Sequence, residues 1–442
     1  MRFLHMADVH LGNQQYNLGA RFNDFGAAFE AAAQVALACE VDAVVIAGDL
    51  FHKSTVDAPT LLQAEFGLRL LHEHAIPVLA VHGNHDKARY REQYSWVDYL
   101  DELGLLHLLA PDYTESPVRL EAERAYWDVD GVRFVGVPWL GASAAKILGE
   151  VAEALDDLPA DGITFTVLAT HAGVEGQMPH ISGALTHADL APLRDRVDYL
   201  ALGHLHKPYQ DGWLYNPGSL ETCSFDEAQW ADERGVFLVE VRPDGTHHAE
   251  PLPTLKRPFC SSNFATDFFG TPDALHEALV THVRHERRQI ARMVQQLADA
   301  LAARGVPSDE AASRARPVVR VVLRGNLTFD RAQLDMERLR RTVQDEIDAL
   351  TIRVENRTLP LGFDMTPDDT LDRGELERLV YEQLVREDAR YGEHVAAWSG
   401  LMQQVKAMAL RRATPEVIFE VLDTLMGAWE EAVDVDHEAA TE

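Results

Sequence analysis

Five short groups of polar residues in the first half of the chain have the residue types and spacing of metal ligands. They are Asp8-Val9-His10, Gly48-Asp49-Leu50-Phe51-His52, Gly83-Asn84-His85-Asp86, Thr170-His171 and Gly203-His204-Leu205-His206. Each group directly follows an apolar run that is typical of a buried strand. Because residues two apart in an extended chain point to the same side, Asp8 and His10 can reach one ion. The glycines suit tight turns and a close approach of the backbone.

The donor atoms of these groups indicate which ions they would hold. They offer carboxylate, amide and imidazole ligands and no thiolate, a set that suits Mn²⁺, Fe or Zn²⁺ better than Ca²⁺ or a structural zinc. Their number exceeds the four ligands that one tetrahedral ion needs. Two ions that share a bridging carboxylate fit better, and a pair ~3.5–4 Å apart could activate water and clamp a phosphoryl oxygen. The sequence therefore predicts metal-assisted hydrolysis of a phosphate ester.

Each group also has a structural alternative. A single Asp-x-His is common, and alone it would be a metal site in roughly one case in ten. Gly-Asp after a strand is often only a turn. Gly-Asn-His-Asp is more specific, and five groups in one order at strand ends leave little room for coincidence. We interpret Cys39, Cys223 and Cys260 as buried apolar side chains, and we leave His5 and His82 unassigned.

The composition excludes several classes of protein. The 442 residues include 71 acids and 40 bases, which gives a net charge of −31. This charge excludes a basic coat protein and argues against generic electrostatic binding to nucleic acid, but not against an enzyme that acts on nucleic acid at a local site. Three cysteines do not indicate a disulfide framework. No apolar run is long enough for a membrane span, and the first residues are too short and polar a stretch for a signal peptide. We therefore expect a cytoplasmic protein.

The elements that must position these residues can be predicted from the apolar pattern. We expect strands at residues 3–7, 41–47, 77–82, 132–137, 163–170, 199–202 and 235–241, and helices at 21–39 and 58–74. The mixture of strand-helix alternation and short antiparallel runs predicts an α/β fold in which two packed sheets have helices outside them.

The charge divides the chain into three blocks. Residues 1–255 carry a net charge of −22, residues 256–350 carry +2, and residues 351–442 carry −11. The second block predicts a long helix at 274–304, a strand at 318–323, a helix at 331–350 and a strand at 351–355. The third block is helical from about residue 366, and its last helix begins at Thr414 as N-cap, before an acidic tail.

The ordered series of groups resembles the signature of the calcineurin-like metallophosphoesterases. That resemblance implies a four-layer core of two mixed sheets flanked by helices, with two Mn²⁺ ions, or Fe or Zn²⁺ in their place. It implies one metal held by Asp8, His10, Asp49 and His206, and a second held by Asp49, Asn84, His171 and His204. His85 would donate a hydrogen bond or proton to the scissile phosphate and leaving oxygen.

One position narrows the resemblance to a branch. The general pattern is Gly-Asp-x-x-Asp, but here the last position is His52, as in the SbcD-type DNA repair nucleases. Asn216-Pro217-Gly218-Ser219-Leu220-Glu221 and the β-α-β pattern at 318–355 are similar to the same family. The resemblance implies a nuclease domain at 1–255, a capping and DNA-binding domain at 256–360 and a helical partner-binding region at 361–442. His52 would orient the phosphate or His85, or position the DNA end.

The resemblance also implies partners. They are DNA, as duplex ends, hairpins and single strands, a coiled-coil SbcC-like ATPase of the SMC type, and a second copy of the chain. The implied activity is 3′ to 5′ exonuclease on duplexes and endonuclease on hairpins and single strands, in double-strand break repair at the nucleoid. An apolar stripe could bind the ATPase or pack within the chain: Val417, Ile418, Val421, Leu422, Leu425 and Met426.

Bases near the site are candidate DNA contacts. Lys87, Arg89 and Arg91 follow the Gly-Asn-His-Asp turn. An arginine cluster on the long helix, which includes Arg284 and Arg287, is interpreted as a solvated face paired with Glu277 and Glu286.

Three other functions compete with the nuclease. A small-molecule or cyclic-nucleotide phosphodiesterase would share the metals but would not need the ~200 residues after the core. An inactive scaffold would show gaps among the ligands, and none is found. A protein phosphatase is disfavoured because His52 replaces the expected Asp.

Overall fold

The computed structural model describes residues 1–88, 94–113, 117–160, 162–177, 184–359, 373–387, 394–410, 414–415 and 417–423. The chain divides into two compact units. The first comprises Met1–Ala265, Asp273–Leu323 and Asp335–Arg357, and the second comprises Thr266–Pro272, Arg324–Leu334 and Thr358–Glu442. Among the described residues, no helix combines the length and the apolar character that crossing a membrane would require.

The first sheet of the first unit contains the N-terminal strand. Its strands, in spatial order, are β12 (His247–Pro253), β11 (Gly235–Val241), β1 (Arg2–Met6), β2 (Ala43–Ile46), β3 (Val78–Ala80) and β4 (His107–Leu108). β1 to β4 run parallel, with Leu4 beside Val44. β11 and β12 are antiparallel additions to the other side of β1. The parallel part gathers the carboxyl ends of β1, β2 and β3 at one edge.

The second sheet carries the remaining strands of the core. In spatial order they are β5 (Tyr126–Val129), β6 (Val132–Val137), β7 (Phe165–His171), β8 (Tyr199–Gly203), β10 (Leu214–Asn216) and β9 (Tyr209–Asp211). β6, β7, β8 and β10 are parallel, whereas β5 and β9 are antiparallel edge strands. His171 therefore ends one central strand and Gly203 ends the next.

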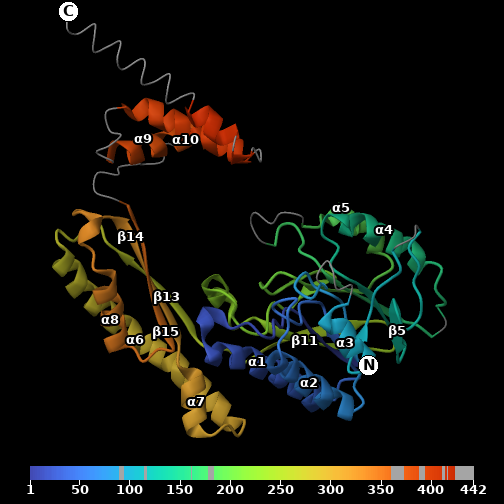
Figure 1. Cartoon of the computed structure of the whole chain (residues 1–442). Helices are drawn as coiled ribbons and strands as arrows, with labels where there is room; N and C mark the ends of the chain where they lie inside the picture. Colours follow the sequence, from blue (N-terminus) through green and yellow to red (C-terminus); the bar gives the residue numbers. More distant parts are fainter. Residues whose placement is uncertain are drawn as a thin grey trace, which may run out of the picture. The chain divides into compact units, whose positions relative to one another are not determined.

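The strands pack into four layers because alternate side chains face opposite ways. Leu4 and Met6 of β1 face the helices α1 (Gly19–Ala38) and α2 (Ala58–Glu73), which cover the first sheet together with α3 (Trp96–Glu102). Phe3 faces the second sheet, where its ring centroid lies 5.3 Å from those of Phe134 and Tyr199. Helices α4 (Ala144–Leu155) and α5 (His187–Leu190) cover the far face of the second sheet (Figure 1). The predicted two packed sheets with helices outside are confirmed.

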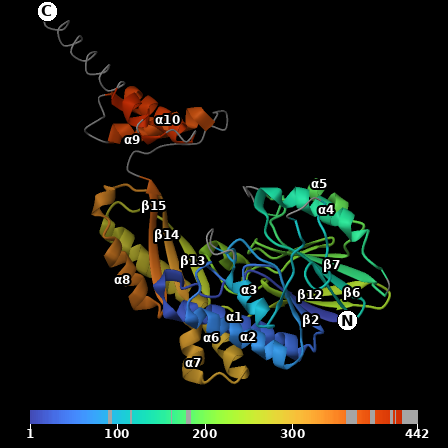
Figure 2. The ribbon, with the colours of Figure 1, turned by 45° about the vertical axis from the view of Figure 1, so that its right-hand side comes forward.

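The residues after 255 add a third sheet, which we call the cap. Its strands are β13 (Phe259–Ala265), β14 (Val318–Asn326) and β15 (Thr351–Leu359), in that order, with helices α6 (Pro272–Ala303), α7 (Ser308–Ala315) and α8 (Met336–Glu346). Figure 2 shows α6 and α8 beside these strands. The prediction of one helix over 331–350 was wrong. Residues Arg331–Gln333 form a separate short 3₁₀ helix, and Ile347 is already extended.

Buried ion pairs fix the first residues of the cap to the core. The Arg257 guanidinium donates to both carboxylate oxygens of Asp24 on α1, at 2.6 and 2.8 Å, and to the carbonyl of Arg316 at 2.6 Å. Arg21, also buried, donates to Asp24 at 2.5 Å and to Glu221 at 3.3 Å. Since breaking such a buried pair leaves an uncompensated charge, these contacts hold the two parts of the first unit together.

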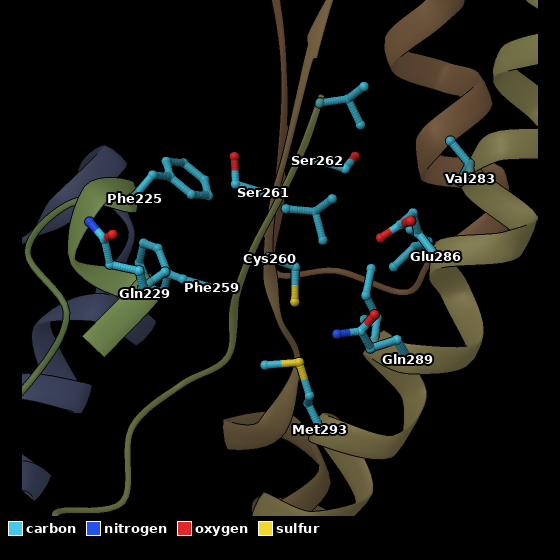
Figure 3. Close-up of a pocket in the computed structure, with 15 residues that line it drawn as sticks. Phe225, Gln229, Phe259, Cys260, Ser261, Ser262, Val283, Glu286, Gln289 and Met293 are labelled. Carbon is cyan, nitrogen blue, oxygen red and sulfur yellow. The ribbon is translucent and has the colours of Figure 1, made fainter. Parts of the chain in front are cut away.

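A mostly apolar cavity of about 320 Å³ lies where the cap meets the short helix η4 (Phe225–Trp230). Phe225 and Phe259 pack edge to face at 5.2 Å on one wall, and Val283 and Ile290 of α6 line another (Figure 3). None of the predicted metal or catalytic residues lines it.

The described C-terminal residues form helices in the second unit. α9 (Arg373–Glu387) packs against α10 (Val395–Leu410), with an ion pair between Glu377 and Lys406. A further helix begins at the predicted N-cap, where the Ile418 N–H donates to the carbonyl of Thr414 at 3.1 Å. Leu425 and Met426 of the predicted stripe lie outside the described residues.

Candidate metal centre

All seven predicted metal residues come together at the carboxyl ends of the parallel strands of the two sheets. Asp8 and His10 follow β1, Asp49 follows β2, Asn84 follows β3, His171 ends β7, and His204 and His206 follow β8. All but the half-buried Asn84, His204 and His206 are buried. Five polar groups, whose outermost members Asp8 and His206 are 198 residues apart in sequence, thus share one site.

The Asp49 carboxylate lies between the two predicted sets of ligands. Its Oδ2 atom is 3.3 Å from His171 Nε2 and 3.8 Å from His10 Nε2. His171 belongs to one set and His10 to the other, so Asp49 is placed as a bridging ligand would be.

At the position predicted for the first metal, the side chains of Asp8, His10 and His206 converge. His10 Nε2 and His206 Nε2 are 3.0 Å apart, and each is within 3.9 Å of the Asp8 carboxylate. His10 is only 2% exposed, and its Nδ1 atom is buried without a hydrogen-bond partner in the described part of the chain. Two ring nitrogens 3.0 Å apart can share a proton, and a similar spacing suits two ligands of one divalent cation. This donor set suits a divalent metal.

On the second side, an amide oxygen gathers two imidazoles. Asn84 Oδ1 is 3.1 Å from His171 Nε2 and 3.0 Å from His204 Nδ1. The other nitrogen of His171 donates to the carbonyl of Ala47 at 2.8 Å. That bond leaves Nε2 as the atom that faces the site, which is how metal-binding histidines are commonly oriented.

The backbone at the site is held in unusual conformations. Asp8, His10, Asp49 and His204 all have positive φ angles, between 51° and 85°. A Cβ atom at Gly83 would overlap the Asp49 carboxylate, and one at Gly203 would overlap the Ala47 carbonyl. Strain of this kind persists only where the surrounding structure imposes it, and it gathers at functional sites.

Asp86, which the sequence analysis did not single out as a ligand or catalyst, ties two loops of the site together. Its carboxylate accepts from the backbone N–H groups of Leu50, Phe51 and Gly83, at 2.9 to 3.2 Å. Burial and the neighbouring Asp49 raise the pKa of this carboxyl. Asp86 therefore fixes the Asp49 loop against the Asn84 loop without facing a metal itself.

In the metal-free protein, histidines and carboxylates balance one another. Burial alone would raise the pKa of Asp49, but His171 and His10 lower it below its usual range. Conversely, burial works against charge on His171, yet Asp49 and Asp8 raise the pKa of His171 to about 9. Burial raises the pKa of Asp8 to about 6 and lowers that of His204 to about 4. The site thus carries protons where divalent cations would bind.

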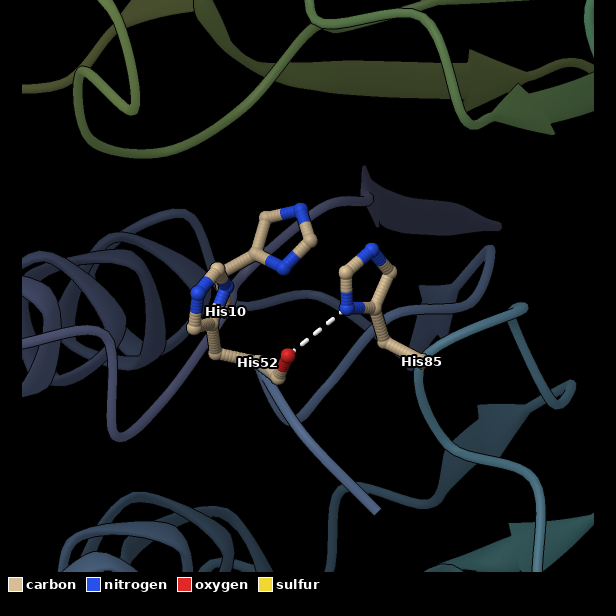
Figure 4. Close-up of side chains that lie close together, drawn as sticks. All are labelled: His10, His52 and His85. Atoms are coloured by element: carbon tan, nitrogen blue, oxygen red, sulfur yellow. Dashed lines mark hydrogen bonds between the residues drawn. The ribbon is translucent and has the colours of Figure 1, made fainter. Parts of the chain in front are cut away.

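His85 and His52, the two predicted catalytic residues, lie side by side at the rim (Figure 4). Their rings stack at 5.5 Å and 19°, and His85 Nδ1 donates to the backbone carbonyl of His52 at 2.7 Å. His85 Nε2 faces the centre, 3.9 Å from Asp49 Oδ2. The orienting bond thus comes from the backbone of residue 52, where the general pattern would place an aspartate. Burial and His85 lower the pKa of His52 to about 4.

Of the three basic residues predicted to contact DNA, the structure describes Lys87. Lys87 lies over the ring of Trp139, with its Nζ atom 4.2 Å from the centroid, and partial burial lowers its pKa. Arg89 and Arg91 lie outside the described residues. On α6, Arg284 and Arg287 pair with Glu346 of α8 at 2.8 and 3.5 Å, so the expected pairing with Glu277 and Glu286 was wrong for these two residues.

A network behind His206 was also missed by the sequence analysis. Glu227 Oε1 accepts from His206 Nδ1 at 3.0 Å. Its other oxygen accepts from Ser219 Oγ, the Cys223 N–H and Arg234, at 2.8 to 3.3 Å. Ser219 belongs to the Asn-Pro-Gly-Ser motif, which is the one signal that could have pointed to this network.

The sequence resembles known phosphoesterases and DNA repair proteins. The family model of the calcineurin-like phosphoesterases matches residues 1–208. Over this part of its length the chain is similar to the calcineurin-like phosphoesterases. The match ends just after His206, so it contains every predicted metal ligand.

Curated relatives extend the similarity past that domain. The chain is 34% identical over 272 residues to the DNA double-strand break repair protein Mre11 of Archaeoglobus fulgidus, covering 55% of this chain and 58% of that one. It is 35% identical over 247 residues to Mre11 of Haloferax volcanii, covering 55% and 50%. The chain thus spans about half the length of these relatives. Among solved structures, calcineurin-like phosphoesterase YfkN from Bacillus subtilis is 14% identical, with a TM-score of 0.37, over 57% of this chain and 88% of that one.

Proposed function

We propose that the chain is a metal-dependent DNA nuclease that hydrolyses phosphodiester bonds in double-strand break repair. The observation that carries this proposal is the Asp49 carboxylate between His10 and His171, with His85 facing it from the rim. The similarity to Mre11 proteins supports DNA as the substrate. The cap and the C-terminal helices support a nuclease over a small-molecule phosphodiesterase, which would not need them.

Two divalent ions would be held by the two ligand sets. Asp8, His10 and His206 would bind one ion and Asn84, His171 and His204 the other, with Asp49 shared. When bound, such ions activate water and offset the negative charge that develops on a phosphoryl group. Oxygen and imidazole donors suit Mn²⁺, with Fe or Zn²⁺ as alternatives.

His85 would act on the leaving group. Its Nδ1 proton is engaged by the His52 carbonyl, so Nε2 is the atom free to meet substrate. A protonated Nε2 would donate first a hydrogen bond to the scissile phosphate and then a proton to the departing sugar oxygen. The side chain is 38% exposed, which makes it reachable from solvent. His52, stacked on the His85 ring, would keep that ring from turning.

The rest of the chain would bind DNA and protein partners. Residues 256–360 would form a capping and DNA-binding domain, because their near-neutral charge repels phosphate less than the flanking blocks do. Residues 361–442 would bind an SbcC-like ATPase. Leu62 and Phe66 lie exposed one turn apart on α2, at 68% and 56%, which supports a homodimer through this helix. Such a protein would work in the cytoplasm at the nucleoid.

The test uses purified chain with Mn²⁺, linear duplex DNA labelled at its 5′ ends, and a small chromogenic phosphodiester. Asp49→Asn is the inactive variant, and Asp130→Asn, at an exposed turn, is the matched control. We expect products shortened from the 3′ end with wild type and the control, and none with Asp49→Asn. Turnover of the small diester with DNA left intact would reject the nuclease and favour a small-molecule phosphodiesterase. No turnover of either would favour a scaffold.

A further inference from the structure

A thiol stands beside the first side of the metal centre. Cys223 Sγ and one ring nitrogen from each of His10 and His206 all lie within 4.8 Å of one another. All three cysteines are half-buried, so the interpretation of them as buried apolar side chains was wrong, and Cys223 stands beside two predicted metal ligands. His10 is almost fully buried, its Nε2 atom faces His206 Nε2 at 3.0 Å, and its Nδ1 atom has no hydrogen-bond partner among the described residues.

Glu227 holds the thiol and the imidazole in place together. One of its oxygens accepts from His206 Nδ1 at 3.0 Å, and the other accepts from the backbone N–H of Cys223 at 2.8 Å. Arg234 donates to the second oxygen at 3.3 Å and is itself buried. Cys223 is therefore anchored by the same carboxylate that orients a predicted metal ligand.

The spacing of the three side chains is close to what an ion of the zinc type needs. With Zn–N distances of about 2.0–2.1 Å and Zn–S of about 2.3 Å, tetrahedral ligand atoms lie roughly 3.3–3.7 Å apart. The Nε2 atoms of His10 and His206 are 3.0 Å apart. The Cys223 sulfur lies no more than 4.8 Å from a ring nitrogen of each histidine, which is about one ångström beyond the tetrahedral spacing. A rotation of the Cys223 side chain about χ1 can close this difference.

We propose that Cys223 is a metal ligand, which with His10 and His206 forms a thiol-containing position selective for Zn²⁺ over Mn²⁺. This inference rests on the metal centre of the proposed function. The other position, built from Asp49, Asn84, His171 and His204, offers oxygen and imidazole donors. Since thiolates favour soft and borderline ions, the two positions would prefer different metals. On binding, the thiol forms a metal–sulfur bond and its proton passes to solvent.

The other two cysteines provide matched controls. Cys39 follows α1, and Cys260 lies on β13, where it lines the cavity beside the cap. All three cysteines are free of disulfides. A Cys39→Ser/Cys260→Ser variant leaves Cys223 as the single thiol of the chain, and Cys223→Ser removes it alone.

Cobalt reports the bond directly. Co²⁺ replaces Zn²⁺ with similar ligands, and a cobalt–thiolate bond gives a sulfur-to-metal charge-transfer band in the near ultraviolet. We expect this band in full-length wild type titrated with Co²⁺ and in the double variant, and its loss in Cys223→Ser. Zn²⁺ affinity, measured by competition with a chromogenic chelator, should fall roughly tenfold or more in Cys223→Ser, with a much smaller change for Mn²⁺.

The outcomes separate this inference from the proposed function. Bound Co²⁺ in wild type with d–d bands but no charge-transfer band, or a band that survives Cys223→Ser, would overturn the assignment of Cys223. Both results are read without DNA. If the band is present but wild type does not cleave DNA, the proposed function fails and the assignment of Cys223 stands. If wild type cleaves DNA but the band is absent, the assignment fails and the proposed function stands.

Discussion

Glu227 Oε1 lies 3.0 Å from His206 Nδ1, and this contact fixes which nitrogen of the ring faces the metal centre. Because the Nδ1 proton is held by the carboxylate, Nε2 is the atom that faces His10 and Asp8, and it offers its lone pair to a metal once it is deprotonated. A carboxylate behind a metal-binding histidine raises the basicity of the ligand as well as orienting it. Glu227 is therefore expected to act on metal affinity through His206.

Glu227→Gln should weaken metal binding about 10- to 100-fold. The amide removes the charge behind His206, and it keeps only one acceptor oxygen where Glu227 accepts from His206 on one side and from the Cys223 N–H on the other. Titration calorimetry with Mn²⁺ measures the change. Glu233→Gln, an exposed site a few residues away, is the control and should bind as wild type does. Equal affinity in both variants would remove Glu227 from the metal centre.

His85 and Asp49 should separate chemistry from metal binding. His85→Gln is expected to keep its metals and to lose roughly 10²- to 10⁴-fold in hydrolysis rate, since it removes a proton donor that no ligand set contains. Asp49→Asn should lose both metal and activity, because this carboxylate lies within 3.8 Å of ligands on both sides. Metal content by mass spectrometry and single-turnover rates decide the case. If His85→Gln stripped the metals, its assignment to the leaving group would be wrong.

Most of the fold and the candidate ligands could be predicted because both depend on local pattern. Apolar runs such as the one ending at Ala47 mark the parallel strands, and the polar residues directly after them must meet where those strands end. Asp86 also belongs to such a group, but the pattern did not show that it joins two loops, and Glu227 and Cys223 follow no such rule. They reach the site through hydrogen bonds to loops distant in sequence, and only the folded chain brings those groups together.

The cap illustrates the same limit for secondary structure. The apolar spacing over 331–350 favours one helix, but two N-caps compete near the start of this stretch. Asp330 caps the Ala332 N–H at 2.8 Å and Asp335 caps the Arg338 N–H at 2.9 Å, so the α-helix begins only after the second. Its end is set by tertiary pairing, because the Leu350 N–H donates to the Pro317 carbonyl as the chain enters β15.

Metal binding should release protons and tighten as the pH rises. The pKa of His171 is raised to about 9 by Asp49 and Asp8 against the effect of burial, so this ligand is protonated at pH 7.5 in the metal-free protein. The pKa of His206 is also raised, by Cys223, Glu227 and Asp8 against burial. Each proton displaced makes the affinity rise about tenfold per pH unit until the pH passes the pKa of that ligand.

Calorimetry in buffers of different ionisation enthalpy counts these protons. At pH 7.5, we expect about one to two protons released per chain as the site fills, and a flatter dependence above pH 9. An affinity for Mn²⁺ that stays constant between pH 6.5 and 9 would show that the histidines are already neutral in the metal-free chain.

The stability of the core should fall in mild acid because of His5. This residue lies between the two sheets, where Nδ1 is 3.0 Å from the Tyr199 hydroxyl and Nε2 is 3.1 Å from the Leu202 carbonyl. The neutral ring satisfies both partners, and burial lowers the pKa of His5 to about 3. The unfolded chain gains its proton near pH 6.5 while the folded chain does not. The contribution to stability is therefore complete above pH 6.5 and is lost as the pH falls toward 3.

By pH 5 this single group should remove about 2 kcal/mol from the free energy of unfolding, relative to pH 7.5. His5→Gln keeps a donor and an acceptor but cannot take up a proton, so its unfolding free energy should depend less steeply on pH. Urea unfolding at pH 7.5 and pH 5 gives the change in unfolding free energy for wild type and for His5→Gln. Subtracting one change from the other cancels the contributions of the titrating groups that the two proteins share. His74→Gln, at an exposed position on the same first unit, should keep the wild-type slope. If His5→Gln lost stability between these pH values as steeply as wild type, the proton uptake would belong to another residue.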